Sequence, residues 1–317
     1  MHGVFLDTAT LHPGDTPDLD FARLRAALPH WTFHDRTAPG EVAARIAAAD
    51  VVVTNKVVLD AALLQGAPRL KLVCVSATGM NNVDLAAAQA AGIPVRNVTG
   101  YAGASVAQHT LALMLGLATQ WHRYAHAVEQ GDWARSPLFC LMHLPVVELA
   151  GRTLGIVGGG NLGRQVGHLA AALGMHVQLA QLPGRATATP APWPRVPWAE
   201  FLRSSDVVSI HCPLTDETRG LFGAGALRAM KPTAFLVNTA RGGIVDEAAL
   251  LTALREGWIA AAATDVLAQE PPAADHPLIA ARLPNLVITP HNAWVSRDSR
   301  QRLLDGVAAN IEAWRRT

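Results

Sequence analysis

Four ionisable residues follow three predicted strands directly, and their types suit a reaction at a carbonyl next to a carboxylate. They are Arg241 after 235–237, Asp265 and Glu270 after 261–264, and His291 after 286–288. An arginine beside two glycines can present its planar guanidinium to a carboxylate, and a histidine can transfer a proton. Ligands of open α/β sheets bind at the carboxyl ends of the strands. One arginine, one carboxylate and one histidine at such an edge would suffice to reduce the ketone of a 2-keto acid.

Taken singly, each of these residues also has an ordinary structural explanation. Arg241 could cap a helix as a surface charge, Glu270 could be solvated, and His291 could be a loop histidine. Their placement at three strand ends, beside a glycine-rich loop, favours a catalytic site.

The glycine-rich loop at 158–163, Gly-Gly-Gly-Asn-Leu-Gly, fits the pattern G-x-G-x-x-G. It directly follows a predicted strand and opens an Ala- and Leu-rich helix, whose N-terminus favours a phosphate. Gly158 would permit the tight turn, Gly160 the close approach of a pyrophosphate, and Gly163 the packing of the helix on the strand. The loop therefore predicts dinucleotide binding, with an ordinary strand-to-helix turn as the alternative.

The end of the next strand informs the choice of dinucleotide. An acid is expected there to bind the ribose 2′-hydroxyl, but the position holds Gln181. Glutamine can still bind a hydroxyl and lacks the charge that would repel a 2′-phosphate. Arg185 follows four residues later and could reach such a phosphate. The sequence therefore leaves NADPH as plausible as NADH.

These residues need a scaffold, and short apolar runs alternating with Ala- and Leu-rich stretches predict β-α-β units around parallel sheets. The first series predicts strands at 4–6, 51–53 and 70–75 and helices at 19–28, 59–64 and 83–91. The second series predicts strands at 153–157, 176–180, 207–210, 235–238, 261–266 and 286–289 and helices at 161–173 and 247–256. We therefore expect the α/β class, with two domains built on parallel sheets.

Two further segments are distinctive. The apolar-rich stretch 104–129 lacks proline and predicts one long helix that could connect two domains. The stretch 183–198 contains five prolines, which exclude a helix or a central strand and favour an extended surface loop.

Composition excludes several other classes of protein. The chain has 317 residues, half of them hydrophobic, and its 26 Lys and Arg against 25 Asp and Glu give a net charge of +1. This balance disfavours a nucleic-acid surface or a polybasic membrane patch. Three scattered cysteines form neither a disulfide framework nor a zinc pattern, and no secretion signal or membrane span is expected, which favours a cytoplasmic location.

His122 and His126, four residues apart, indicate a helix-face pair rather than metal ligands.

Several motifs together resemble the D-isomer-specific 2-hydroxyacid dehydrogenase family, and more narrowly its glycerate dehydrogenase (hydroxypyruvate reductase) branch. The resemblance extends through nearly the whole chain. It is carried by Ser-Ala-Thr-Gly-Met-Asn-Asn-Val-Asp at 76–84, Ser-Val-Ala-Gln-His-Thr at 105–110, the glycine loop, His-Cys-Pro-Leu at 211–214, Asn-Thr-Ala-Arg-Gly-Gly at 238–243 and Thr-Pro-His at 289–291.

The resemblance implies two Rossmann-like domains with a cleft between them: a flavodoxin-like substrate domain at 1–99 and 288–317, and a dinucleotide-binding domain at 100–287. It makes Arg241, Glu270 and His291 the catalytic residues. Arg241 would bind the substrate carboxylate and polarise the ketone. His291 would donate a proton to the carbonyl oxygen while hydride arrives from NAD or NADP, and Glu270 would stabilise the charged imidazolium.

The resemblance also implies the binding residues. The substrate would contact Ser76, Ala77, Thr78 and Gly79 as well as Arg241 and His291. The cofactor would contact Thr110, Gly158, Gly160, Asn161, Leu162, Gly163, Gln181, Arg185, Cys212, Pro213, Thr218, Thr239, Ala240 and Asp265. The segment 131–145, with Trp133, Phe139 and Leu141, resembles the arm through which family members form dimers, and a core-covering loop is the alternative.

Other functions on the same fold stay open. Another dehydrogenase of this family, such as formate or phosphoglycerate dehydrogenase, would share these motifs, although nothing singles out formate. A nucleotide-sensing corepressor or scaffold could keep the same residues, although we expect no appended interaction segment or charged tail. The sequence does not decide the 2-hydroxy acid, the physiological direction, or whether Lys56 faces the cleft.

Overall fold

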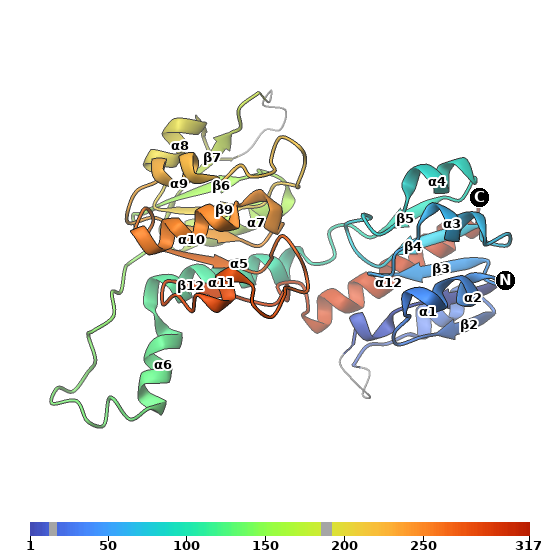
Figure 1. Ribbon diagram of the computed structural model, residues 1–317, viewed down its shortest axis with the longest axis horizontal. Helices are drawn as coiled ribbons and strands as arrows, with labels where there is room; N and C mark the ends of the chain where they lie inside the picture. Colours follow the sequence, from blue (N-terminus) through green and yellow to red (C-terminus); the bar gives the residue numbers. More distant parts are fainter. Residues whose placement is uncertain (13–17, 185–191) are drawn as a thin grey trace. The chain divides into compact units, whose positions relative to one another are not determined.

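Two parallel sheets organise the chain in the computed structural model, which describes residues 1–12, 18–184 and 192–317 (Figure 1). The chain divides into unit 1, Met1–Ala102 with Trp294–Thr317, and unit 2, Gly103–Ala293. We expected the second division at 287/288. It falls later because β12 (Leu286–Ile288) pairs with β11 (Ala261–Thr264) of unit 2.

The sheet of unit 1 has the order β2-β1-β3-β4-β5, which is the doubly wound flavodoxin-like order. Its strands are β1 (His2–Phe5), β2 (His30–Phe33), β3 (Val51–Thr54), β4 (Leu72–Val75) and β5 (Val95–Asn97). Its helices are α1 (Ala22–Ala27), α2 (Val42–Ile46), α3 (Ala61–Gln65), α4 (Leu85–Ala90) and α12 (Arg297–Arg315), with 3-10 turns at Thr8–Thr10 and Pro39–Glu41. The C-terminal α12 and α1 share one core cluster with the sheet.

The sheet of unit 2 has the order β12-β11-β10-β9-β6-β7-β8, all parallel. Its remaining strands are β6 (Thr153–Val157), β7 (His176–Gln181), β8 (Arg195–Pro197), β9 (Val207–Ile210) and β10 (Phe235–Asn238). Its helices are α5 (Gly103–Thr119), α6 (Trp121–Glu129), α7 (Asn161–Ala172), α8 (Trp198–Ser204), α9 (Ala224–Ala229), α10 (Glu247–Glu256) and α11 (Pro277–Ala280), with a 3-10 turn at Gly242–Ile244. The strand order reverses between β6 and β9, where dinucleotides bind in such sheets. The predicted α/β fold with two parallel sheets is confirmed.

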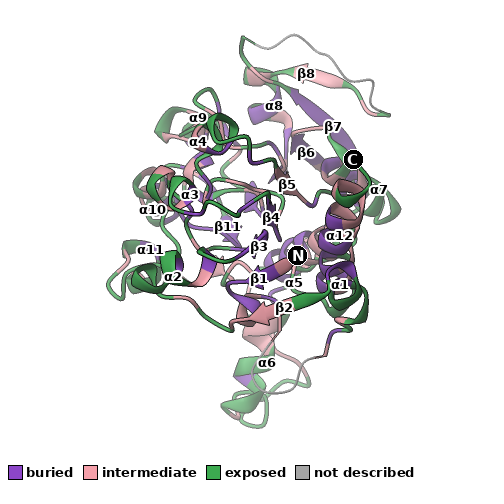
Figure 2. Cartoon of the chain, turned by 90° about the vertical axis from the view of Figure 1, so that its right-hand side faces the viewer, coloured by how far each residue is buried: buried purple, intermediate pink, exposed green. Residues whose placement is uncertain are grey.

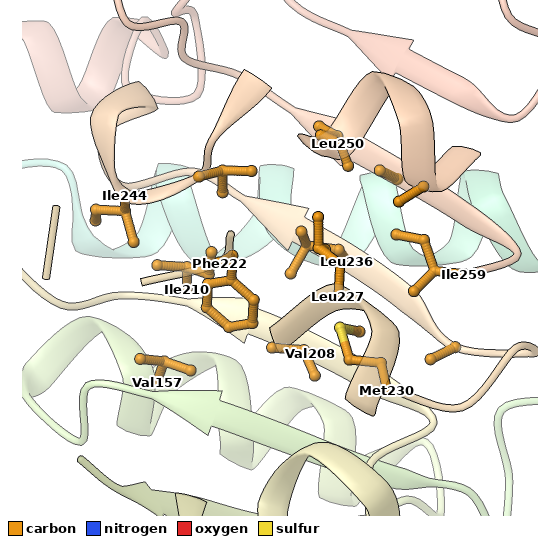
Figure 3. Packing of buried hydrophobic residues seen from close by; sticks show 14 of the residues in the cluster. Val157, Val208, Ile210, Phe222, Leu227, Met230, Leu236, Ile244, Leu250 and Ile259 are labelled. Atoms are coloured by element: carbon orange, nitrogen blue, oxygen red, sulfur yellow. The ribbon is translucent and has the colours of Figure 1, made fainter. Parts of the chain in front are cut away.

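Helices cover both faces of the unit 2 sheet, which explains why its strands are almost continuously apolar. On one face Phe222, Leu227 and Met230 pack against strand residues such as Val208 and Leu236 (Figure 3). On the other face α5 and α7 pack against β6 and its neighbours. Figure 2 shows inner strands such as β3 and β6 as buried, whereas the edge strand β8 is only partly buried.

The expected single helix over 104–129 is wrong, because Gln120 ends α5 and separates it from α6. Its φ of 54° lies in the left-handed region, which a right-handed helix cannot include. The buried Gln120 donates its backbone N–H to the carbonyl of Gly116 (3.0 Å) and its Nε2 to the carbonyl of Leu117 (2.7 Å). These bonds satisfy carbonyls at the end of α5, so the helix ends without glycine or proline.

The described parts of the proline-rich stretch, 183–184 and 192–198, contain no central strand. Its residues 195–197 are β8, which pairs with β7 at the edge of the sheet, and Trp198 begins α8. An edge strand tolerates prolines because its outer side makes no ladder hydrogen bonds. Arg185 lies outside the described residues, so its predicted role stays a prediction.

Candidate active site

Asp265 organises the loop that carries His291. Directly after β11, this buried carboxylate accepts hydrogen bonds from Thr289 Oγ1 (2.6 Å), Asn292 N (3.0 Å) and Ala293 N (3.0 Å). The Asp265 carbonyl also accepts the backbone N–H of His291 at 2.8 Å. One residue thereby holds both sides of the turn that follows β12.

The turn places His291 in a backbone conformation that most residues avoid. Its φ is 52°, in the left-handed region, where a non-glycine residue costs roughly 1–3 kcal/mol and persists only if the surrounding structure imposes the conformation. The Asp265 hydrogen bonds on both sides supply that constraint. Strain of this kind, at an ionisable residue beyond a strand end, is typical of functional sites.

The side chain of His291 contacts the predicted acid. Its Nδ1 lies 2.5 Å from Oε2 of Glu270, and each side chain is about one third exposed (31% and 32%). The other carboxylate oxygen accepts the backbone N–H of Leu267 at 2.9 Å, which orients Glu270. Because the carboxylate accepts at Nδ1, Nε2 is the nitrogen that remains for a substrate.

Arg241 lies on the loop after β10, the strand next to β11. The carbonyl of Arg241 accepts Nδ2 of Asn238 (3.0 Å), and the Asn238 Oδ1 accepts the N–H of Ala240 (3.0 Å). A Cβ on Gly242 would stand only 2.0 Å from the carbonyl carbon of Leu267, so only glycine lets this loop pack against the loop that leads to Glu270. The Arg241 side chain itself is exposed.

The glycine loop lies at the carboxyl end of β6 and opens α7, as its pattern predicts. Gly158 has a φ of 104°, and a Cβ there would stand 2.6 Å from the backbone nitrogen of Cys212. A Cβ on Gly163 would stand 2.1 Å from the Gly158 carbonyl oxygen, whereas one on Gly160 meets nothing within 4 Å. The first and last glycines are therefore required by packing, and Gly160 leaves open space.

This geometry fits a dinucleotide. A backbone that approaches a pyrophosphate closely needs a residue without a side chain on the approach, and the free amides of a helix start stabilise the phosphate charge. Gly160 caps α7 and is exposed, and Asn161 and Leu162 are the first residues of that helix.

The other predicted cofactor residues lie around the same strand ends of unit 2. Thr110 on α5 and Thr239 after β10 are buried and share a hydroxyl hydrogen bond of 2.9 Å. After β9, Cys212 is buried and Pro213 exposed, and Thr218 Oγ1 donates to the Pro213 carbonyl at 2.7 Å. Gln181 is exposed at the end of β7, and Ala240 follows Thr239.

His211, between β9 and Cys212, is a neutral structural histidine. Burial lowers its pKa to about 3. Its Nε2 lies 2.8 Å from Ser209 Oγ, and its backbone N–H donates to the carbonyl of Val157 at 2.7 Å. These contacts hold the β9 loop beside the glycine loop.

The predicted substrate loop, Ser76, Ala77, Thr78 and Gly79, follows β4 in unit 1. The Ser76 N–H donates to the carbonyl of Thr54 (2.8 Å), so this amide is already used. The carbonyls of Ala77 and Thr78 accept from Val98 N (3.1 Å) and Asn97 Nδ2 (2.6 Å). The loop is thus fixed through its carbonyls.

Lys56, whose orientation the sequence left open, follows β3 of the same sheet and is exposed. Its backbone N–H donates to the buried carboxylate of Asp7 at 2.6 Å. Burial is the main reason why the pKa of Asp7 is raised, although the Asn55, Lys56 and Val57 amides oppose that shift.

The sequence reasoning missed four residues that support the site. The Nε2 of His109, on α5, lies 3.1 Å from Thr289 Oγ1 and 3.6 Å from Asp265 Oδ1. His109 lies next to Thr110 in the motif at 105–110, and Thr289 lies two residues before His291 in the motif at 289–291. This nearness in sequence to predicted site residues could have indicated both. Glu247, at the start of α10, accepts Ala268 N at 2.7 Å and lies 3.2 Å from Nε2 of the largely buried His276. No spacing in the sequence links that pair.

The remaining predicted features lie away from these strand ends. His122 and His126 are on α6, and the described residues contain no group of three or more potential ligands that could hold a metal ion. Trp133 and Phe139 of the segment 131–145 are exposed, and Leu141 is half-buried. None of the described helices is long and apolar enough to cross a membrane.

Comparison with known proteins agrees with this geometry. The family model for the D-isomer specific 2-hydroxyacid dehydrogenase, NAD binding domain, matches residues 111–293. The chain is 41% identical to glycerate dehydrogenase of Methylorubrum extorquens, over 95% of this chain and 94% of the relative. It is 37% identical to hydroxypyruvate reductase of Blautia hydrogenotrophica, over 98% and 96%. The structure of the NADPH-dependent glyoxylate/hydroxypyruvate reductase of Sinorhizobium meliloti in complex with NADP and malonate matches with a TM-score of 0.82 at 27% identity, covering 100% of this chain and 94% of that one.

The family model spans more than half of the chain, and both relatives align over nearly its full length. The chain therefore belongs to the D-isomer specific 2-hydroxyacid dehydrogenase family and is an NAD(P)-dependent oxidoreductase.

Proposed function

We propose that this enzyme reduces a small 2-keto acid, either hydroxypyruvate to the D-2-hydroxy acid or glyoxylate to its achiral 2-hydroxy acid, and catalyses the reverse oxidation. The observation that carries the proposal is the contact between His291 and Glu270, one strand away from the loop of Arg241. The names of the matched glycerate dehydrogenase and hydroxypyruvate reductase support the substrate class.

Arg241, Glu270 and His291 divide the chemistry among them. Arg241 binds the substrate carboxylate with its planar guanidinium and polarises the neighbouring ketone. The imidazolium of His291 donates its Nε2 proton to the carbonyl oxygen, which becomes the hydroxyl of the product. Glu270 holds the Nδ1 proton and stabilises the positive charge before that transfer. When bound, NADH or NADPH supplies the hydride that reduces the carbonyl carbon.

The two units have different roles in this proposal. Unit 2 binds the cofactor through Gly158, Gly160, Asn161, Leu162 and Gly163, with the pyrophosphate at the start of α7. Residues Thr110, Gln181, Cys212, Pro213, Thr218, Thr239, Ala240 and Asp265 complete the cofactor site. Unit 1 is the substrate domain, in which the loop of Ala77, Thr78 and Gly79 offers amides to the substrate carboxylate and Ser76 anchors the loop through Thr54.

We also propose that two copies associate through the segment 131–145. Phe139 is 91% exposed and Met142 is 75% exposed, and Trp133 and Leu138 add to this apolar surface. Monomeric proteins rarely leave such side chains grouped in water. Light scattering after size exclusion should give twice the chain mass for the native protein and the chain mass for a variant with Phe139→Glu and Met142→Glu. A native monomer would contradict this assembly.

A steady-state assay tests the function directly. The purified protein is incubated with hydroxypyruvate or glyoxylate, and oxidation of NADH and NADPH is followed in parallel by absorbance. The product of hydroxypyruvate is resolved by chiral chromatography and should be the D-isomer. Cofactor binding without turnover on any 2-keto acid would reject the proposal and favour a nucleotide-sensing scaffold.

A further inference from the structure

The edge strand β8 brings a cation beside the end of β7, where the adenosine ribose is expected in this fold. The register pairs Leu179 with Arg195 and Gln181 with Pro197. Side chains two residues apart on a strand share one face of the sheet, as do registered neighbours in a parallel pair. Arg195 and Gln181 therefore lie on the same face, the one that bears α7 and the glycine loop.

The guanidinium of Arg195 reaches the glycine loop itself. Its Nη2 lies 3.3 Å from the position that a Cβ on Gly159 would occupy, so the guanidinium lies directly against Gly159. A second arginine, Arg164 of α7, donates from Nε to the carbonyl of Gly159 at 3.2 Å. Both arginines are half-buried. Two cations thus border the part of the loop nearest to β7.

The position of Arg195 is imposed by packing. Two residues before Arg195, the side chain of Trp193 packs against α7. A Cβ on Gly167 of this helix would stand 2.4 Å from the Trp193 ring. The Trp193 ring also packs against His168, with 4.9 Å between ring centroids. Glycine at 167 therefore admits the indole, and the indole fixes the chain that enters β8.

We propose that Arg195 binds the 2′-phosphate of NADP and gives this site a preference for NADP(H) over NAD(H). The inference rests on the proposed function and narrows its cofactor. An arginine fork suits a phosphate because it donates two parallel hydrogen bonds to its oxygens. Gln181 is compatible with that phosphate, whereas an acid at the same position would repel it and bind the 2′-hydroxyl instead.

Calorimetry with nucleotide fragments tests the site without turnover. The fragment 2′,5′-ADP differs from 5′-AMP only in the 2′-phosphate, so the ratio of their dissociation constants measures that group alone. The native protein should bind 2′,5′-ADP at least about tenfold more tightly than 5′-AMP. Arg195→Gln should remove about tenfold or more of this preference and leave 5′-AMP affinity within about twofold.

Two further variants keep the test decisive. Arg203→Gln removes an exposed arginine of α8 and should leave the ratio unchanged. Gln181→Glu adds a charge without altering β8 and should lower 2′,5′-ADP affinity by about tenfold. A native protein that binds both fragments equally, or an Arg195→Gln variant that keeps the native ratio, would overturn the assignment. Because no keto acid is present, this failure is distinct from a failure of the reductase activity.

Discussion

In the glycine-rich loop, Gly158 and Gly160 should respond differently to substitution by alanine. Gly158→Ala places a Cβ 2.6 Å from the Cys212 nitrogen and in a left-handed backbone conformation. Gly160→Ala places a Cβ in open space with an ordinary φ of −71°. The first substitution therefore perturbs the fold, and the second perturbs what binds there.

The magnitudes follow from these contacts. Left-handed backbone costs alanine roughly 1–2 kcal/mol, and forcing backbone atoms apart costs about 1–3 kcal/mol more, so Gly158→Ala should lower the free energy of unfolding by about 2–5 kcal/mol. Gly257→Ala is a matched control, since Gly257 has a φ of 71° with nothing within 4 Å and should show only the smaller cost. Gly160→Ala should stay within about 1 kcal/mol of the native protein.

Urea unfolding and cofactor titration measure the two effects separately. Gly160→Ala should weaken binding of NADH and NADPH by about tenfold or more, because its methyl group stands where the pyrophosphate approaches. Gly257→Ala should bind both cofactors normally. Native cofactor affinity in Gly160→Ala, or a Gly158→Ala variant as stable as Gly257→Ala, would refute this account of the loop.

Three other substitutions or conditions test the surroundings. Glu270→Gln should lower kcat by about 100-fold, because an amide cannot stabilise the imidazolium of His291, and a variant with native kcat in the steady-state assay would contradict its role. Glu247→Ala removes the acceptor of the Ala268 N–H and should lower kcat about tenfold with cofactor affinity unchanged; Glu256→Ala on the same helix is the control, and loss of cofactor binding would indicate general disruption. Burial lowers the pKa of His211 to about 3, so below about pH 6.5 the unfolded state binds the extra proton and stability falls with falling pH. Between about pH 6.5 and pH 5 the free energy of unfolding should fall by about 1.6 kcal/mol by urea unfolding, and His211→Gln should flatten this part of the profile.

Regular strands and helices could be predicted because their residues face uniform surroundings. The bounds predicted for β9, β10 and α10 are those observed, since buried parallel strands are continuous apolar runs and α10 is an Ala- and Leu-rich run that follows Asp246. The break at Gln120 was not predictable from composition. A left-handed glutamine carries no sequence signal, and the hydrogen bonds that hold it are made only after α5 has formed.

For the site, the sequence indicates residue types but not their contacts. Strand ends predicted that Asp265, Glu270 and His291 would be neighbours, because neighbouring parallel strands end at one edge of a sheet. The left-handed His291 and the pairing of Glu247 with His276 depend on loop packing between residues far apart in sequence. Such contacts follow from the folded backbone, which residue spacing alone does not specify.

The substitution His291→Ala tests whether this histidine protonates the carbonyl oxygen. Hydroxypyruvate reduction is measured under saturating cofactor, and cofactor dissociation constants are measured by calorimetry on the same preparations. We expect kcat to fall by at least about 100-fold while cofactor affinity stays within about twofold of that of the native enzyme. Unchanged kcat, or a loss of activity matched by an equal loss of cofactor affinity, would contradict it.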